Sequence, residues 1–139
     1  PGEQAFVQKM APEGLEVIVG AQRDRQFGPL VMFGLGGVYV EVLEDVSFRL
    51  APLNQEDARG MGMETAAGKL LKGVRGQPRR DIEAVVETIR RIGQLMADHP
   101  QISEIDLNPL IVGEKGAWAV DVRIVLEGQE GPGDDSPVG

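Results

Sequence analysis

Two short segments near the C-terminal end of the chain, residues 106–110 (DLNPL) and 118–123 (WAVDVR), constrain its fold more than any other feature. Their flanks are rich in the β-branched and aromatic residues that favour strands. The stretch between the strands, residues 113–116, contains two glycines and suits a tight loop. We therefore predict that the two segments form one β-hairpin.

The register of this hairpin decides which side chains share a face. With a loop of residues 113–116, the opposed pairs are Val112 with Ala117, Leu110 with Ala119, Asn108 with Asp121, and Asp106 with Arg123. Because side chains alternate along a strand, one face is predicted to be apolar and the other polar. The apolar face would hold Ile105, Leu107, Ile111, Trp118, Val120, Val122 and Ile124. The polar face would hold Glu104, Asp106, Asn108 and Asp121.

Asn108 and Asp121 form a candidate site for a divalent cation. Opposed residues of an antiparallel pair have Cβ atoms about 4.5–5.5 Å apart, so both side chains could reach one ion. Mg²⁺ is typically held by one or two carboxylates while water and phosphate fill its other positions. The alternative is an acidic, solvent-facing hairpin with Asp106 and Arg123 as an ordinary ion pair. The polar residues and the proline of segment 106–110 weaken it as a strand, and a function at this position would explain why they are there.

Composition excludes several classes of function. The chain has 139 residues, enough for one domain or part of one, and a formal net charge of −8. Such an acidic chain is a poor general binder of nucleic acid. The absence of cysteine excludes disulfides, zinc–thiolate sites and cysteine nucleophiles. No apolar run reaches the roughly 20 residues that span a bilayer, and we expect a cytoplasmic protein without membrane contact. The first residue is Pro1, so we expect a fragment or one half of a two-lobed fold.

Strand-like segments dominate the first part of the chain, and helical segments follow. The predicted strands are residues 5–10, 15–24, 29–33, 38–43 and 46–50. Predicted helices cover residues 54–59, 65–71 and 81–98, the last with an apolar stripe at helical spacing and Asp81 as its N-cap. We expect an α+β domain over residues 1–126, with a largely antiparallel sheet and helices on one face. Residues 127–139 are rich in Gly, Pro and Asp, and are predicted to form a disordered tail or linker.

Four further positions are candidates for binding or catalysis. Gly34, Gly36 and Gly37 could let backbone amides approach a phosphate, although a turn that requires positive φ is the favoured explanation from the residues alone. Glu16 and Glu41 are carboxylates in apolar strands that could contact ribose, metal or a phosphorylated partner residue. Pairing of Glu16 with Lys9, and exposure of Glu41 to solvent, are the simpler explanations. Arg49 could contact phosphate or form a salt bridge at a strand edge.

Five motifs occur in an order that resembles one family. They are residues 16–20 (EVIVG), 24–29 (DRQFGP), 33–37 (FGLGG), 48–53 (FRLAPL) and 106–110 (DLNPL). Together they resemble the ATP-grasp portion of ADP-forming acyl-CoA synthetases, which are related to the succinyl-CoA synthetase β subunit. The resemblance covers roughly residues 4–125.

The resemblance implies an ATP-grasp second lobe that binds ATP or ADP with Mg²⁺. It implies the reversible reaction of acyl-CoA, ADP and phosphate to carboxylate, CoA and ATP, through a phosphohistidine on a partner domain or subunit that binds CoA. Asn108 and Asp121 match the family's metal ligands, and Asp106 matches an acidic residue that can orient the phosphohistidine. Gly36 and Gly37 match the glycine pair of the central loop. An oligomeric assembly that supplies the first lobe is also implied.

One departure and three alternatives remain. Residues 60–68 are richer in glycine than a helix of this family is expected to be, which puts that helix in question. Because the first lobe and the phosphohistidine segment are absent, the isolated chain is expected to be inactive. The alternatives are another ATP-grasp carboxylate ligase, an acyl-CoA-sensing region of a protein lysine acetyltransferase, and an interaction domain with an acidic surface.

Overall fold

The computed structural model describes residues 13–36, 45–73 and 76–128, and the account below concerns these residues. The elements are β1 (Leu15–Asp24), β2 (Gly28–Leu35), β3 (Val46–Leu50), α2 (Gln55–Met63), α3 (Ala66–Lys72), α4 (Ile82–Asp98), β4 (Ile102–Val112), β5 (Ala117–Ala119) and β6 (Val122–Leu126). The strands predicted at 15–24 and 46–50 and the three helices are confirmed, with shifts of a few residues at some ends. The strands predicted at 5–10 and 38–43, and nearly all of the predicted tail, lie outside the described residues.

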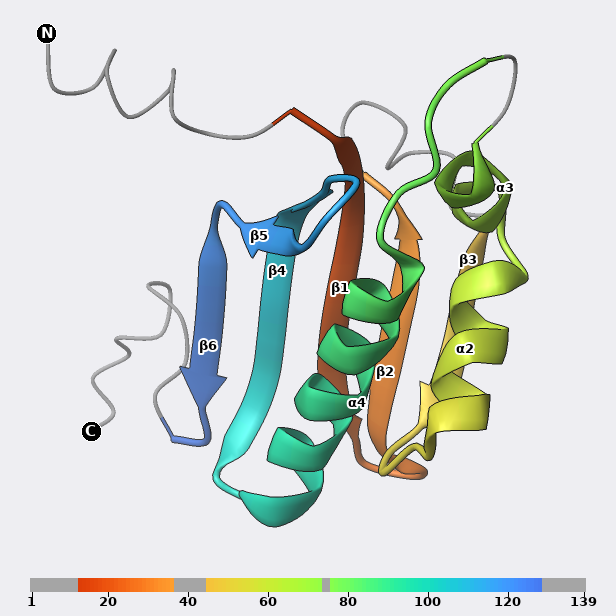
Figure 1. The fold of residues 1–139 in the computed structure, drawn as a ribbon. Coiled ribbons are helices and arrows are strands. Elements are labelled where there is room, and N and C mark those ends of the chain that lie inside the picture. Colours follow the sequence, from red (N-terminus) through yellow and green to blue (C-terminus); the bar gives the residue numbers. More distant parts are fainter. Residues whose placement is uncertain (1–12, 37–44, 74–75, 129–139) are drawn as a thin grey trace, which may run out of the picture.

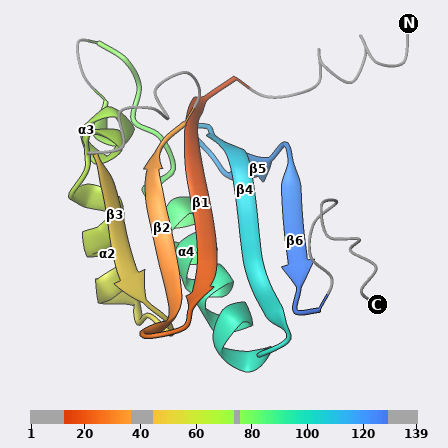
Figure 2. The ribbon, with the colours of Figure 1, turned by 180° about the vertical axis from the view of Figure 1, so that it is seen from behind.

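The strands form one antiparallel sheet with the helices on a single face. The order is β3-β2-β1-β4-β5, and β6 pairs with β4 beside β5. Figure 1 shows α2, α3 and α4 in front of the sheet, and Figure 2 shows the opposite face with no helix across it. The predicted α+β class with a largely antiparallel sheet is therefore confirmed. No helix in the described part of the chain is long and apolar enough to cross a membrane.

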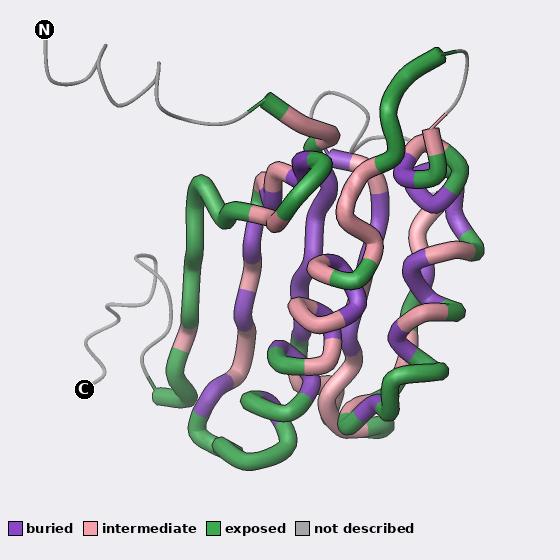
Figure 3. The backbone as a smooth tube through the Cα atoms, in the orientation of Figure 1, coloured by how far each residue is buried: buried purple, intermediate pink, exposed green. Residues whose placement is uncertain are grey.

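The core lies between the sheet and its helical layer. It is built from alternate residues of the central strands, such as Val17 and Val19 of β1 and Phe33 of β2, and from the apolar stripe of α4. Figure 3 shows the buried residues along the central strands and on parts of the helices that lie in front of them. Burial of large apolar side chains is the dominant stabilising term of such a fold. Consequently, the helix-covered face is the structural face, and the other face is free for function.

Caps and one glycine explain the local helix boundaries. Asn54 accepts a hydrogen bond of 2.7 Å from the Asp57 amide, which satisfies a free donor in the first turn of α2. The helix questioned over the glycine-rich residues 60–68 is present, since α2 continues to Met63 and α3 starts at Ala66. A Cβ on Gly68 would lie 2.7 Å from the Met63 carbonyl oxygen. Glycine at this position therefore lets the two helices follow each other closely.

The predicted hairpin has the expected pairs, but its alternation of faces breaks in the middle of β4. Leu107 pairs with Val19 of β1. Leu110 pairs with Val17, so β4 contains one more residue than β1 between these pairs. Such a bulge moves the following side chains to the opposite face. The extra residue falls at Asn108-Pro109, where proline offers no amide hydrogen to the ladder.

The prediction that Ile111 shares the apolar face with Ile105 is therefore wrong. Beyond the bulge, Leu110 and Val112 are buried under the helices, whereas Ile111 is half-buried and pairs with exposed Glu16. The prediction assumed strict alternation along one strand. The bulge depends on the pairing with β1, which is almost 90 residues away in the sequence.

Candidate functional site

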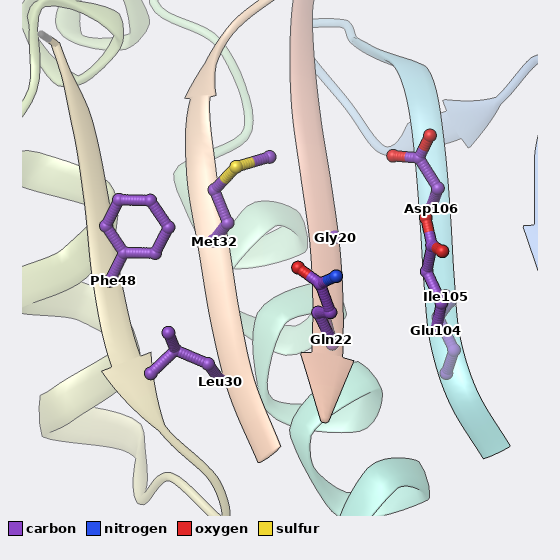
Figure 4. A pocket seen from close by; sticks show the side chains of 9 residues that line it. Gly20, Gln22, Leu30, Met32, Phe48, Glu104, Ile105 and Asp106 are labelled. Carbon is purple, nitrogen blue, oxygen red and sulfur yellow. The ribbon is translucent and has the colours of Figure 1, made fainter. Parts of the chain in front are cut away.

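A shallow pocket opens on the face of the sheet that carries no helices. Its volume is about 110 Å³, and it is lined by Gly20, Ala21, Gln22, Leu30, Met32, Phe48, Glu104, Ile105 and Asp106. Figure 4 shows side chains from β1, β2, β3 and β4 converging on it, with α4 behind the sheet. Apolar groups from β2 and β3 form one side, and the two carboxyl-bearing residues of β4 form the other. A pocket with an apolar wall and a few polar groups suits a small organic ligand that carries charge.

Gly20 forms the floor of this pocket. A Cβ at Gly20 would lie 3.4 Å from Oδ1 of Asp106 and 3.7 Å from the terminal methyl group of Met32. Any larger side chain would therefore fill the space between the acidic and apolar walls. The sequence analysis assigned no role to Gly20, because a glycine within a strand gives no sign of what lies above it.

Asp106 is the most perturbed carboxyl group of this face. Desolvation by partial burial and the nearby charges of Glu104 and Asp121 raise the pKa of Asp106, and Arg123 opposes the shift. Arg123 lies directly opposite Asp106 in the ladder, but its guanidinium forms an ion pair of 3.3 Å with Glu104 instead. Among the described residues, the Asp106 carboxylate receives no hydrogen bond or ion pair. A ligand or cation that reached this carboxylate would relieve the repulsion.

Asn108 and Asp121 are adjacent across the hairpin, as the register predicts. The backbone amide of Asn108 donates a hydrogen bond of 3.2 Å to the backbone carbonyl oxygen of Asp121. Both residues are exposed, and the Asp121 carboxylate is near enough to Asp106 to affect its pKa. Amide and carboxylate oxygens are the hard donors that Mg²⁺ prefers.

The donor set nevertheless leaves room for ligands from elsewhere. Within the described ranges, no group of three or more His, Cys, Asp or Glu side chains could hold a metal ion by itself. A cation at Asn108 and Asp121 would therefore complete its coordination with water, phosphate oxygens or residues from another part of the protein. The residues present fit a Mg²⁺–nucleotide site better than a site that binds free metal tightly.

Gly34, within β2, and Gly36, directly after it, serve close packing in this structure. A Cβ on Gly36 would lie 3.2 Å from the Val17 carbonyl carbon, and one on Gly34 would lie 3.2 Å from Cγ2 of Val46. Neither has the positive φ that a turn would require. The Gly36 amide donates to the Glu16 carbonyl oxygen at 2.9 Å, so it is already used within the sheet. The phosphate-positioning role of this segment stays a prediction, and Gly37 lies outside the described residues.

The remaining candidate residues lie apart from the pocket or outside the described ranges. Arg49 donates two hydrogen bonds to the Glu64 carboxylate, the shorter 2.7 Å long. This pair supports the salt-bridge alternative for Arg49, which belongs to the helix-covered side of β3. The hydrogen bond from Arg49 lowers the pKa of Glu64. Glu16 is exposed on β1, and its expected partner Lys9 lies outside the described residues, as does Glu41.

The described residues thus form a six-stranded antiparallel sheet with helices on one face and a pocket lined by Glu104 and Asp106 on the other. A family profile described as ATP-grasp domain matches residues 2–126. The chain belongs to the ATP-grasp domain family.

Relatives with assigned activities support this placement. The chain is 51% identical over 121 residues to the β subunit of acetate–CoA ligase (ADP-forming) I of Pyrococcus furiosus, covering 87% of this chain and 52% of the relative. It is also 51% identical over 124 residues to acetate–CoA ligase (ADP-forming) I of Archaeoglobus fulgidus, covering 89% of this chain and 18% of that protein. The chain thus spans about half of the first relative and a smaller part of the second.

A solved structure shows the same fold with ligands. It is the acetyl-coenzyme A synthetase 1 of Ca. Korarchaeum cryptofilum in complex with coenzyme A and Mg-AMPPCP, with its phosphohistidine segment pointing towards the nucleotide binding site. The TM-score is 0.80 at 47% identity, over 90% of this chain and 61% of that chain. The predicted family and fold are therefore confirmed.

Proposed function

We propose that this chain is the part of an ADP-forming acyl-CoA synthetase that binds Mg²⁺ and nucleotide. The complete enzyme would convert acyl-CoA, ADP and phosphate reversibly into carboxylate, CoA and ATP through a phosphohistidine. One observation carries the proposal: Asn108 and Asp121 are paired in the hairpin, beside an acidic pocket on the open face. The high identity to ADP-forming acetate–CoA ligases supports it further.

In the proposed chemistry, this lobe acts by binding and charge stabilisation, and none of its residues forms a covalent bond to the phosphoryl group. Bound Mg²⁺ would neutralise charge that develops on the transferred phosphoryl group, which is the main requirement of phosphoryl transfer. Asn108 and Asp121 would hold the cation, and the open face of the sheet would hold the nucleotide against its partner lobe. Asp106 would orient an imidazole that approaches the phosphate. The Asp106 carboxylate accepts no hydrogen bond from the described residues and its pKa is raised, which supports this role, because an imidazolium would supply a positive partner.

The partners of this chain follow from the same proposal. The relative from Pyrococcus furiosus is named a subunit, and this chain spans 52% of it. We therefore propose that a first ATP-grasp lobe and a domain or subunit that binds CoA and carries the phosphohistidine complete the enzyme, and that the isolated chain has no synthetase activity. Robust ATP formation by the isolated chain would contradict this part of the proposal.

The test replaces the two cation ligands separately in the complete enzyme. Asp121→Ala and Asn108→Ala should each reduce acyl-CoA-dependent ATP formation by at least about a hundredfold, since charge stabilisation in the transition state is lost. Asp98→Asn is the matched control, because Asp98 is an exposed carboxylate at the last residue of α4 whose one hydrogen-bond partner within the described ranges is Gln94 on the same helix. Near-normal turnover in Asp121→Ala, with the control active, would rule out the cation site.

Two further measurements separate the alternatives. Detection of a phosphohistidine in the intact protein during turnover would exclude a ligase that forms a free acyl phosphate. Calorimetric titration with Mg²⁺–ADP would distinguish a functional site from a regulatory domain that senses acyl-CoA only. Binding that is lost in Asp121→Ala supports the synthetase proposal.

A further inference from the structure

One residue, Asp81, joins the N-terminus of α4 to the loop of the hairpin between β4 and β5. Its Oδ1 accepts a hydrogen bond of 3.0 Å from the Ala84 amide. Its Oδ2 accepts one of 2.6 Å from the Gly116 amide. Its own amide donates one of 2.7 Å to the Gly113 carbonyl oxygen. The first bond caps the helix, and the other two hold both ends of the four-residue loop.

Capping alone does not require this arrangement. An N-cap needs only one side-chain oxygen, and Asn54 caps α2 with a single bond to the Asp57 amide. The second carboxylate oxygen of Asp81 accepts its hydrogen bond from the hairpin loop, at Gly116, which is 35 residues further along the chain. Hydrogen bonds to an ionised carboxylate are shorter and stronger than those between neutral groups. Asp81 therefore does more than start α4.

The loop also packs against the Trp118 ring. The Trp118 ring lies 3.1 Å from where a Cβ on Gly113 would be and 3.5 Å from where one on Gly116 would be. Gly116 has a φ of 92°, a conformation that L-residues rarely adopt, so its amide direction depends on glycine. Both Asp81 and Trp118 therefore contact the loop.

This position matters for the two proposed cation ligands. Asn108 and Asp121 lie where regular pairing is interrupted, because β5 ends at Ala119 and β6 begins at Val122. An irregular stretch has fewer ladder hydrogen bonds to hold its strands together. Regular pairs flank this stretch, Leu107 with Val122 on one side and Leu110 with Ala119 on the other. β5 contributes only three pairs, and beyond them the hairpin ends in the loop that Asp81 binds.

We propose that Asp81 is a positioning residue for the cation site: by fixing the hairpin loop on α4, it holds the short strand β5 in place and thereby steadies the position of Asp121 relative to Asn108. The proposal rests on the proposed function of these two residues. It assigns Asp81 no contact with Mg²⁺ or nucleotide.

Asp81→Asn in the complete enzyme tests the proposal. Asparagine keeps one oxygen for the Ala84 amide, but it directs an NH₂ group at the Gly116 amide, so that two donors face each other. The helix cap should survive while the bond to the loop is lost. Asp81→Ser is a second variant, since serine caps helices well but is too short to reach the loop. Asn54→Ala is the control: it removes the cap of α2, and Asn54 makes no hydrogen bond to the hairpin among the described residues.

Hydrogen exchange across residues 113–116 and the Mg²⁺ concentration for half-maximal activity are measured in each protein. In Asp81→Asn and Asp81→Ser, we expect faster exchange in the loop and an approximately tenfold higher Mg²⁺ requirement, with the KM for acyl-CoA unchanged. In Asn54→Ala, we expect a lower melting temperature and an unchanged Mg²⁺ requirement.

Two different failures can be distinguished. If the loop exchanges faster in either Asp81 variant while the Mg²⁺ requirement stays at the wild-type value, Asp81 has only a structural role and the inference is overturned. If Asp121→Ala has the same Mg²⁺ requirement as the wild-type enzyme, the proposed function fails first. If one of the two Asp81 variants does not fold, the other is used for the test. If neither Asp81→Asn nor Asp81→Ser folds while Asn54→Ala does, the inference is also overturned.

Discussion

The backbone amide of Asn108 donates a hydrogen bond of 3.2 Å to the backbone carbonyl oxygen of Asp121. This contact joins β4 to the segment between β5 and β6, where regular pairing is interrupted. An amide and a carboxylate side chain thereby start from neighbouring backbone positions. Asp106, with its raised pKa, belongs to the same face as the pocket beside them.

Asp106→Asn should stabilise the free protein at neutral pH. Because the pKa of Asp106 is raised in the folded state, the folded protein holds this proton to a higher pH than the unfolded chain. The free energy of unfolding therefore falls as the pH rises from the ordinary aspartate range through the raised pKa. Asparagine removes this loss, so the variant should exceed the wild type more at pH 7.5 than at pH 4.5.

Urea denaturation at the two pH values measures this difference. Glu114→Gln, in the exposed hairpin loop, is a suitable control for the general effect of removing one negative charge. A variant Asp106→Asn that is less stable than the wild type at pH 7.5 would show that Asp106 forms a favourable interaction in the free protein.

Gly20→Val should block the pocket without unfolding the sheet. A Cβ at this position already approaches Asp106 and Met32 closely, and the two additional methyl groups would occupy much of a pocket of about 110 Å³. We expect at least an approximately tenfold weaker binding of Mg²⁺–ADP, which corresponds to about 1.4 kcal/mol. Calorimetry of the complete enzyme measures this loss.

The matched control for Gly20→Val is Ala119→Val, which adds bulk to an exposed residue at the end of β5, outside the pocket. Unchanged nucleotide affinity in a folded Gly20→Val enzyme would mean that the nucleotide does not use this pocket.

Arg49→Gln should have a small effect on stability and little effect on catalysis. The Arg49–Glu64 pair is partly exposed, with side-chain exposures of 35% and 44%, and such pairs contribute about 0.2–1 kcal/mol. Since Arg49 lowers the pKa of Glu64, this contribution is present above the ordinary pKa of glutamate and is lost as the pH falls through the lowered value. Thermal denaturation should show a larger difference at pH 7 than at pH 3.5.

Steady-state kinetics of Arg49→Gln test the other role predicted for this residue. If ATP formation stays within about twofold of the wild type, the role of Arg49 is limited to its exposed ion pair with Glu64, which contributes little. A loss of more than tenfold in kcat would instead support a phosphate contact made in the complete enzyme.

Gly68→Ala should destabilise the junction of α2 and α3. Its Cβ would lie 2.7 Å from the Met63 carbonyl oxygen and 2.8 Å from that of Gly62, both of which are backbone atoms that cannot move freely. We expect a loss of about 1–3 kcal/mol, the usual effect of overpacking. Gly60→Ala is the control: nothing lies within 4 Å of the added methyl group, so alanine should stabilise α2 or leave it unchanged. Equal stability of the two variants would contradict the packing argument.

Patterns confined to one segment were sufficient for most of the fold. The strand at 15–24, the helix capped by Asp81 and the hairpin register each depend on spacings within about 20 residues. Side-chain periodicity and turn geometry operate over such distances. The pairing of Asn108 with Asp121 could therefore be predicted before any tertiary structure was available.

Features that depend on distant segments could not be predicted in this way. The bulge that buries Leu110 instead of Ile111 arises from pairing with β1, and the ion pair of Arg49 requires Glu64 to arrive from α2. The approach of Asp106 to Gly20 and the hydrogen bond from Gly116 to Asp81 also join distant segments, so no local sequence pattern predicts them.

The sequence by itself thus determined the elements, the family and the two proposed cation ligands, because these follow from local patterns and from motif order. Only the tertiary structure decided which face is open, what lines the pocket, and how Asp81 supports the hairpin. Those properties depend on which distant groups come within a few ångströms of one another, and that is settled by the packing of the whole chain.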